Sequence, residues 1–397
     1  MRILVHDYPG HAFPVQLSRA LAARGHTVRH VAFPDFEAPK GPLARRDDDP
    51  ANFDTHFLDL GEPFAKHSFL TRWRQERRLG ELSAQAVTAW RPEIVLAGNA
   101  PIDVQAGTLA GARACGAAFV YWLQDIVGIA MRRILGQRLS LAGTLVGIAY
   151  EWRERRMLRA SDAVVAITED FRPLLEGWGV ARARTHTVEN WAAREEIAPA
   201  GRDNAWARAH GLTAAPVFLY SGTLGLKHDP SLLADLARAQ PHAQVVVCSE
   251  GRGADWLKAN AADLANLRVL PFQPFDRLGE VLASADVLVA VLEPDAGIFS
   301  VPSKVLTYLC AGRPLLLAVP PANLAARIVA REGAGLAADP LDRAGFLAAA
   351  ARLAGDGALR AAMGAKALDY AAKTFDISAI AARFEAILAE AARTRMP

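Results

Sequence analysis

The sequence predicts an α/β protein with two doubly wound domains, each built on a parallel sheet. Short apolar runs of strand length alternate with longer segments of helical periodicity, and the alternation begins again after a polar stretch at 192–213. We place the linker between the domains in that stretch. The predicted domains are 1–198 and 199–379, and a C-terminal helix at about 380–397 is expected to pack back on the first domain.

Composition and charge favour a cytoplasmic protein that binds no nucleic acid. The 397 residues are 52% hydrophobic and 22% charged, and the formal net charge is only +3. The three cysteines, Cys115, Cys248 and Cys310, lie in or beside apolar runs, as reduced and buried thiols do. No secretion signal is expected at Met1, and the apolar stretch 139–150 is shorter than the roughly 20 residues that cross a bilayer.

The first half opens with a βαβ unit. Strand 2–5 leads into a loop that holds Gly10 and His11, and helix 15–24 and strand 27–33 follow. The loop lacks the G-x-G-x-x-G pattern, which argues against a nicotinamide cofactor held there. The other elements expected in this half are a short strand near Phe57, helix 69–90, strand 94–97, a helix of small residues after Pro101, strands 117–123 and 162–167, helix 169–178 and a strand-like run at 185–191.

Two groups of polar residues in this half are candidates for chemistry. Gln124 and Asp125 directly follow a strand, and ligands of open α/β sheets lie at the carboxyl ends of strands. Asp125 has an alternative role as a helix cap. The run Asp47-Asp-Asp49 could suggest a metal, but Pro50 follows at once and a solvated turn is favoured, so no metal site is predicted.

Segment 132–159 is the most basic stretch of the chain. It holds seven arginines against Glu151 and Glu154, a local net charge of +5, beside leucines, isoleucines, Tyr150 and Trp152. Such a segment fits a helix that rests on an anionic membrane surface. A core helix with a solvated basic face fits equally well, and both interpretations stay open.

The second half restarts with strand 217–220 and centres on a strand, loop and helix at 286–314. Gly297 lets backbone approach a ligand, Pro302 suits a first helical position, and Ser303 and Lys304 occupy the first turn. Free amides, the helix dipole and a lysine at one helix start predict a phosphate site, although Lys304 could simply be solvated. The remaining expected elements are a helix from Pro230, strands 244–248, 267–270 and 315–318, and helices near 342–354, 357–373 and 377–394.

These residues resemble a known family. The order of elements, the run Ser221-Gly-Thr-Leu-Gly-Leu-Lys227, the pair Glu250-Gly251 and the P-S-K-x-x-x-Y-x-x-x-G-R-P run from Pro302 to Pro314 are similar to the retaining family 4 glycosyltransferases. More narrowly, they resemble the colanic-acid and O-antigen type of bacterial polysaccharide transferases. The resemblance implies the GT-B fold, in which two Rossmann-like domains face a central cleft.

The resemblance also implies roles for particular positions. The donor, a nucleotide-diphosphate-sugar, would lie mainly on the second domain, with Lys227 at its diphosphate and Glu250, Gly251 and Phe272 near its nucleobase. The implied donor-binding positions are Gly10, Thr223, Glu250, Gly251, Phe272, Glu293, Asp295, Gly297, Ile298, Phe299, Ser300, Ser303, Lys304 and Thr307. The implied catalytic positions are Lys227, Asp125 and Gln124, and the acceptor-side positions are His11 and Asn190.

Two expected glutamates are missing from the donor loop. The second falls on Thr307, and the first falls on Phe299 or, with a longer loop, on Gly297 or Asp295. A carboxylate that would accept both ribose hydroxyls is thus replaced by one hydroxyl, and Glu293 or Asp295 would serve the sugar instead.

Two further family positions also differ. The arginine expected five residues before Lys227 is Gly222, so one lysine must carry more of the diphosphate charge, with help from Lys304. A histidine common after the strand at 117–123 is Gln124, which cannot titrate and could only orient or hydrogen-bond.

The resemblance implies sugar transfer, with retention, from a nucleotide-sugar to a lipid-linked saccharide or other glycan at the inner membrane face. No cofactor or metal is expected, since the nucleotide-sugar is a substrate and a donor phosphate oxygen would take the acceptor proton. Two alternatives stay open. A nucleotide-sugar 2-epimerase shares the architecture but needs acid and base groups that Gln124 cannot supply. A non-catalytic nucleotide-sugar-binding subunit fits the missing glutamates.

Overall fold

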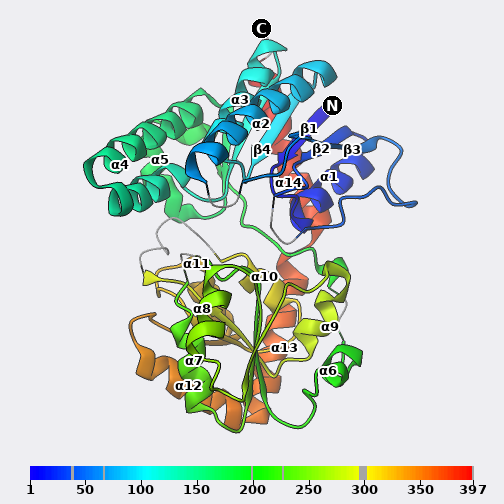
Figure 1. Cartoon of the computed structure of the whole chain (residues 1–397). Coiled ribbons are helices and arrows are strands. Elements are labelled where there is room, and N and C mark those ends of the chain that lie inside the picture. Colours follow the sequence, from blue (N-terminus) through cyan, green and yellow to red (C-terminus); the bar gives the residue numbers. More distant parts are fainter. Residues whose placement is uncertain (37–39, 66–67, 198–199, 226–227, 295–301, 396–397) are drawn as a thin grey trace. The chain divides into compact units, whose positions relative to one another are not determined.

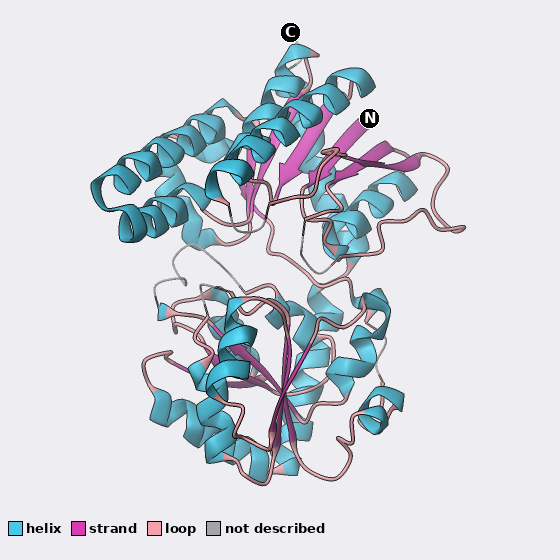
Figure 2. Ribbon diagram, viewed as in Figure 1, coloured by secondary structure: helices cyan, strands magenta, loops and turns pink. Residues whose placement is uncertain are grey.

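The computed structural model forms two compact units and describes residues 1–36, 40–65, 68–197, 200–225, 228–294 and 302–395 (Figures 1 and 2). Unit 1 comprises Met1–Asn190 and Ile377–Pro397, and unit 2 comprises Trp191–Asp376. Each unit is a parallel sheet with helices on both faces, so the predicted pair of doubly wound domains is confirmed.

The sheet of unit 1 has the strand order β3-β2-β1-β4-β5-β6-β7, and all neighbours are parallel. The chain runs outward from β1 and then crosses back to β4, so the order reverses between these two strands. The strands are β1 (Arg2–Asp7), β2 (Thr27–Ala32), β3 (Phe53–Phe57), β4 (Ile94–Gly98), β5 (Ala118–Leu123), β6 (Ala163–Ala166) and β7 (Thr185–Thr187). The helices are α1 (Ala12–Ala23), α2 (Phe69–Trp90), α3 (Ile102–Ala114), α4 (Val127–Ala160), α5 (Arg172–Gly177) and α14 (Ile377–Arg395).

Helix α14 is part of the core of unit 1, although it lies at the far end of the sequence. Phe384 is fully buried and its ring meets the ring of Trp122 on β5, with centroids 4.9 Å apart. On its exposed side, Glu385 pairs with Arg24 and with His26. Aromatic packing and these ion pairs together hold the C-terminal helix against α1 and the sheet.

Helices α2 and α3 pack together through glycines. A Cβ added to Gly107 would lie 2.2 Å from the Gly80 carbonyl oxygen, and one added to Gly111 would lie 2.8 Å from the Ala84 Cα. The two helix backbones are therefore in direct contact, and at Gly107 and Gly111 there is no room for a side chain larger than the glycine hydrogen.

Helix α4 folds back on itself, a feature that the sequence pattern of 132–159 did not predict. A Cβ on Gly128 would lie 2.6 Å from the Glu151 Cα, and one on Gly147 would lie 2.2 Å from the Arg132 Cα. Residues so far apart in sequence can meet only if the two halves run antiparallel, as Figure 1 shows. We call this element the α4 hairpin, with a first arm from Val127 and a second arm that ends at Ala160.

A buried carboxylate joins the two arms. Glu154 on the second arm accepts hydrogen bonds from the backbone N–H groups of Val127 (3.1 Å) and Gly128 (2.8 Å), so it caps the first arm. Burial raises the pKa of Glu154 to about 7, although the two N–H groups act in the opposite direction. The helix cap therefore carries a proton near neutral pH in part of the population.

The triple aspartate lies in a turn rather than on a strand. Asp47 and Asp48 are exposed, and Asp49 is ion-paired with Arg19. This is the solvated turn that the sequence favoured, whereas the expectations for two other segments were wrong in detail. The expected helix 169–178 is a 3-10 turn (Glu169–Phe171) followed by the short α5, and the strand-like run 185–191 pairs only as β7.

The sheet of unit 2 has the order β10-β9-β8-β11-β12-β13, also fully parallel, with the reversal between β8 and β11. Its strands are β8 (Val217–Ser221), β9 (Gln244–Cys248), β10 (Leu267–Leu270), β11 (Val287–Val291), β12 (Leu315–Ala318) and β13 (Gly335–Ala338). Its helices are α6 (Ala205–Ala209), α7 (Ser231–Ala239), α8 (Arg252–Asn260), α9 (Leu278–Ala283), α10 (Lys304–Leu309), α11 (Leu324–Glu332), α12 (Arg343–Gly355) and α13 (Gly357–Thr374).

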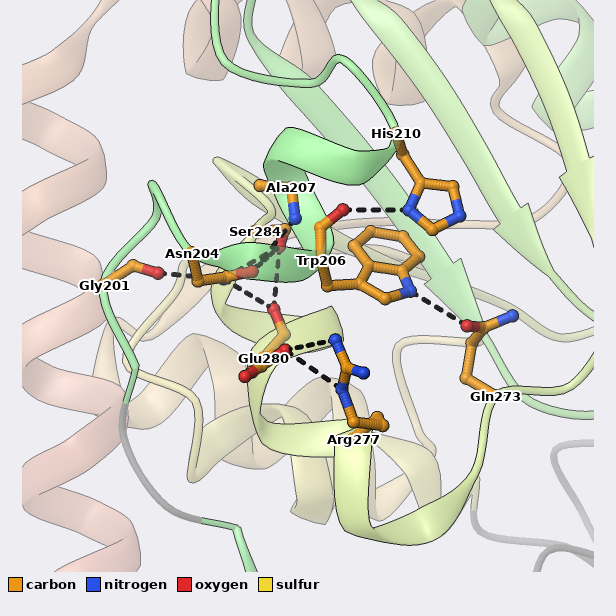
Figure 3. Close-up of polar contacts among 9 residues, drawn as sticks. All are labelled: Gly201, Asn204, Trp206, Ala207, His210, Gln273, Arg277, Glu280 and Ser284. Atoms are coloured by element: carbon orange, nitrogen blue, oxygen red, sulfur yellow. Dashed lines mark hydrogen bonds and ion pairs between the residues drawn. The ribbon is translucent and has the colours of Figure 1, made fainter.

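The segment around α6 is bound to unit 2 by side-chain hydrogen bonds (Figure 3). The Asn204 side chain caps α6 by accepting from Ala207 N (3.0 Å), and its Nδ2 donates to the Glu280 carbonyl on α9 (2.9 Å). Trp206 Nε1 donates to Gln273 Oε1 (2.9 Å) in the loop after β10. The polar residues of this stretch, which look like a free linker in the sequence, are used in local contacts.

We predict that Gly107→Ala destabilises unit 1. The new methyl group must push α2 away from α3, an overpacking cost of about 1–3 kcal/mol that exceeds the gain in helix propensity. The melting temperature should fall by roughly 2–8 °C. Gly355→Ala is the matched control, because nothing lies within 4 Å of a Cβ there, and it should leave the melting temperature unchanged or raise it. Equal effects of the two substitutions would contradict this account of the helix pair.

We also predict that Glu154→Gln changes how stability depends on pH. The pKa of Glu154 is raised in the folded state, so the native carboxyl stabilises the fold below its unfolded value of 4.5 and loses this contribution as the pH rises through about 7. Glutamine does not ionise, and its single oxygen can accept from one of the two N–H groups, which donate to different oxygens of Glu154. Between pH 5 and pH 8 the variant should gain about 3 kcal/mol of unfolding free energy relative to the native chain. Parallel pH curves, measured by urea unfolding, would refute the raised pKa.

Candidate functional site

The candidate site of unit 2 lies where the strand order reverses, outside the carboxyl ends of β8 and β11. Open α/β sheets bind ligands in such places, because the two neighbouring loops diverge there. Of the sequence-predicted residues, Thr223 follows β8, Glu293 follows β11, and Ser303, Lys304 and Thr307 lie at or in α10. Lys227, Asp295, Gly297, Ile298, Phe299 and Ser300 lie outside the described residues.

Lys304 is held at the end of β8 by three contacts. Its Nζ lies 3.7 Å from the centroid of the Tyr220 ring, donates to the Tyr220 hydroxyl and lies 3.3 Å from the Thr223 carbonyl oxygen. The Tyr220 hydroxyl in turn donates to the same carbonyl (2.7 Å). The ring, the hydroxyl and the carbonyl in these three contacts carry no formal charge, and they fix the ammonium at the end of β8.

The same ammonium lies beside Gly222, the position where the resembled family has arginine. A Cβ on Gly222 would lie 3.4 Å from both Lys304 Cε and Nζ, and the glycine has φ +123°, which strains any other residue. Lys304 therefore lies next to the backbone from which the family arginine would extend. Helix α10 begins at Lys304, two residues later than the expected start at Pro302.

Tyr308 fixes α10 to β8, a role that the sequence analysis did not assign. Its hydroxyl accepts from Ser221 N (2.8 Å) and donates to Ser221 O (3.0 Å), and the side chain is buried. Burial raises the pKa of Tyr308, so the phenol stays protonated and can donate. The spacing of four residues from Lys304 in the P-S-K-x-x-x-Y run, one helical turn, is the signal that could have linked the two.

The predicted nucleobase residues lie on neighbouring loops after β9 and β10. The half-buried Glu250 accepts from Phe272 N (3.3 Å), and Gly251 has φ +92° directly before α8. Gln273, the next residue along, is held from the other side by Trp206 (Figure 3). The structure thus brings Glu250, Gly251 and Phe272 together on one loop pair.

Glu293 and Thr307 occupy different surroundings. The exposed Glu293 lines a recess of about 250 Å³ together with Asp229, Leu341 and Arg343, and the Arg343 guanidinium is ion-paired with Asp229 (2.6 Å). Thr307 is half-buried on α10.

The candidate site of unit 1 lies at the reversal between β1 and β4. Asp7, the last residue of β1, is buried and accepts from His11 N (2.6 Å) and Asn99 Nδ2 (3.2 Å). Burial raises the pKa of Asp7, while His11, Asn99 and Lys40 act to lower it. Gly10 turns the loop with φ +76°, and a Cβ there would lie 2.7 Å from a Leu43 methyl group. Sequence reasoning named Gly10 and His11 and missed Asp7 and Asn99; Asp7 ends β1 and Asn99 directly follows β4, and these positions at strand ends were the available signal.

Gln124 and Asn190 form a reciprocal amide pair at the same edge of the sheet. Gln124 Nε2 donates to Asn190 Oδ1 (3.2 Å), and Asn190 Nδ2 donates to Gln124 Oε1 (2.5 Å). Two residues predicted separately, 66 positions apart, are therefore in contact, and each orients the other. Asp125 is half-buried beside Gln124, ahead of the α4 hairpin. Among the described residues, no three His, Cys, Asp or Glu side chains are grouped closely enough to hold a metal.

Comparison with known proteins finds a sequence family that matches part of the chain and solved structures with a similar fold. Residues 12–191 match the family described as "glycosyl transferase 4-like domain". Solved structures with a similar fold include sucrose-phosphate synthase from Thermosynechococcus elongatus, at 17% identity over 98% of both chains with a TM-score of 0.74. Anabaena HepE in complex with UDP-glucose is 16% identical over 98% of this chain and 99% of that chain, with a TM-score of 0.71. No curated protein sequence matches.

A third neighbour is WaaG, a glycosyltransferase involved in lipopolysaccharide biosynthesis, at 15% identity over 98% of this chain and 99% of that one, with a TM-score of 0.68. At these identities the likeness establishes the fold, so the protein has the GT-B architecture. The family match covers residues 12–191, less than half of the chain, and concerns that segment alone.

We predict that Tyr308→Phe destabilises unit 2, because it leaves the Ser221 N–H without its partner. Loss of such a hydrogen bond costs about 1–3 kcal/mol, which should lower the melting temperature by several degrees. Tyr8→Phe is the control: the Tyr8 hydroxyl is buried and, among the described residues, has no hydrogen-bond partner. Its removal should be neutral or stabilising. A Tyr308 variant as stable as the native chain would show that the clamp on α10 lies elsewhere.

Proposed function

We propose that this protein is a retaining glycosyltransferase that moves a sugar from a nucleotide-diphosphate-sugar to a lipid-linked saccharide or other glycan acceptor in bacterial surface polysaccharide assembly, of the colanic-acid and O-antigen type. The observation that carries the proposal is Lys304. Its ammonium lies at the strand-order reversal of unit 2, against Gly222 and beside the Tyr220 ring and the Thr223 carbonyl. A cation so placed suits the diphosphate of a nucleotide-sugar.

The donor would lie along the carboxyl edge of unit 2. Its nucleobase would meet the Glu250 and Phe272 loops, and its diphosphate would meet Lys304 and Lys227. The neighbour HepE was solved with UDP-glucose, which makes UDP-sugars the first donors to test. Thr307, Glu293 and Asp295 stay proposals for the ribose and sugar, together with Gly297, Ile298, Phe299, Ser300, Ser303, Thr223 and Gly10.

Leaving-group stabilisation would be the main catalytic effect. As the bond from sugar to phosphate breaks, negative charge grows on the nucleotide diphosphate, and lysines fixed nearby stabilise that charge without reorganisation. We propose that Lys227 and Lys304 supply this charge without a metal. A donor phosphate oxygen would take the acceptor proton, so no carboxylate nucleophile is required.

The acceptor would lie on unit 1. The Gln124–Asn190 amide pair offers fixed donors and acceptors to sugar hydroxyls, and Asp125 and His11 lie at the same edge of the sheet. We propose a cytoplasmic location with contact to the inner membrane face through 132–159. No helix in the described part of the chain is long and apolar enough to cross a membrane.

We predict that Lys304→Met lowers kcat/KM for sugar transfer by about 30- to 1000-fold, as expected for loss of a cation that stabilises transition-state charge. Lys227→Ala should have a loss of the same order. Lys373→Met is the control, since Lys373 is exposed and paired with Asp369 far along α13.

The donor is first chosen by a thermal-shift panel of UDP-, GDP-, ADP- and dTDP-sugars, because a ligand that binds only the folded state raises the melting temperature.

The outcomes separate the alternatives. Unchanged transfer by the Lys304 variant would overturn the role of this lysine. Formation of an epimer from donor alone would favour the epimerase. Tight binding of a nucleotide diphosphate without transfer to any acceptor would favour a binding subunit.

A further inference from the structure

The second arm of the α4 hairpin exposes an apolar stripe. Leu141, Leu145, Ile148 and Trp152 are spaced by four, three and four residues, so they lie on one face of the helix. Their exposed fractions are 80%, 68%, 47% and 57%, although stripes with this spacing are normally buried. The stripe extends about 16 Å along the helix axis.

A cationic groove continues the stripe along the same arm. It has a volume of about 420 Å³ and is lined by Trp152, Arg155, Arg156 and Arg159. Within the described part of the chain, none of these three arginines pairs with a carboxylate: Arg155 donates to the Trp178 carbonyl (3.1 Å), and Arg156 lies over the Trp152 ring. The groove therefore offers unneutralised positive charge.

The opposite face of the arm is fixed to the body of unit 1. Arg153 pairs with Asp103 on α3 (2.6 Å), and the Tyr150 hydroxyl donates to the same carboxylate (3.1 Å). Glu154 caps the first arm from within. These contacts hold the stripe and the groove outward, so their exposure is a property of the packed helix rather than of a loose end.

Neighbouring charges reinforce the groove. Arg184 donates to the backbone carbonyl of Arg159 (3.3 Å) and so adds a further cation beside it. The nearby carboxylate of Asp162 is already paired with Arg113 (2.7 Å) and lies 3.7 Å from Arg395. An anion that enters the groove thus meets arginines and the Trp152 side chain.

We propose that the second arm of the α4 hairpin docks the protein on a bilayer that contains anionic lipid, with the stripe among the acyl chains and the groove around a lipid phosphate. This inference rests on the membrane location in the proposed function and names its site. The order along the helix is apolar, then tryptophan, then arginine, which follows the layers of a membrane interface from acyl chains to headgroups.

The groove is an anchor and not the acceptor site. Arg159 lies at the end of α4 that leads into β6, at the amino edge of the sheet, whereas Gln124 follows the carboxyl end of β5. A lipid phosphate at the Arg159 end of the groove is therefore at the opposite edge from Gln124, whereas the Trp152 end lies nearer, because Glu154 caps the first arm at Val127. Loss of docking should leave donor binding to unit 2 intact.

The test is flotation of the full chain with vesicles of phosphatidylcholine, with and without 30% phosphatidylglycerol. Binding is expected only with the anionic lipid and should weaken as salt rises. Arg155→Gln/Arg156→Gln/Arg159→Gln should weaken binding on the order of 100-fold, since each arginine near an anionic surface contributes about one factor of five. Leu141→Ser/Leu145→Ser/Ile148→Ser should also weaken it, while binding keeps its salt dependence.

The control removes three charges elsewhere. Arg208, Arg238 and Arg331 are ion-paired with carboxylates in unit 2, so Arg208→Gln/Arg238→Gln/Arg331→Gln matches the charge loss without touching the groove. This control should float like the native chain. Circular dichroism and a thermal shift with the chosen nucleotide-sugar confirm that each variant folds and binds donor, which separates failure of docking from failure of the proposed function.

Three results would overturn the proposal. They are equal binding to neutral vesicles, unchanged flotation of the groove variant, and a dimer in solution that the Leu141/Leu145/Ile148 variant abolishes. The last would show that a second copy of the chain covers the stripe.

Discussion

The parallel sheets constrain where every candidate residue of this protein can lie. Successive parallel strands must be joined by crossovers, so the loop that leaves each strand starts at the carboxyl edge of the sheet, where ligands of open α/β sheets bind. In unit 1 Asp7 and Asn99 are hydrogen-bonded there and Gln124 lies at the same edge, and in unit 2 Lys304 reaches the end of β8. Strands such as β5 and β11 are fully buried. Their backbone hydrogen bonds and packed apolar side chains fix the residues from which the loops begin.

At the proposed donor site, the positive charge comes from Lys304 on α10 and not from a cationic residue at position 222. Gly222 cannot carry the family arginine without strain, and Lys304 approaches the same backbone from α10. Tyr308 fixes the position of α10, because its hydroxyl accepts from the Ser221 N–H and donates to the Ser221 carbonyl at the end of β8. A lysine presents a compact charge, so the proposed site favours phosphate oxygens without the fork geometry of arginine.

The α4 hairpin joins stability to the proposed membrane contact. Glycines at 128 and 147 allow its arms to touch, and Glu154 supplies the cap that the start of the first arm lacks in its own Ncap side chain. The inner face is used for these contacts and for Asp103, which leaves the leucines and arginines of the outer face without a place in the core. Because the inner face of the second arm packs on unit 1, the outer face with its leucines and arginines is the one that remains exposed for binding.

The sequence by itself determined the two doubly wound sheets, because strand-length apolar runs and helical periodicity are local patterns that survive in the fold. It also placed Gln124 and Glu250 just after strands and Lys304 at a helix start, where position along the chain is enough. It could not show that the α4 hairpin folds back on itself. Gly128 and Gly147 are present in the sequence, but a glycine alone does not identify the backbone segment that packs against it. Only the tertiary structure paired Gln124 with Asn190, set Lys304 beside Gly222 and buried Glu154, since each depends on which distant residues meet.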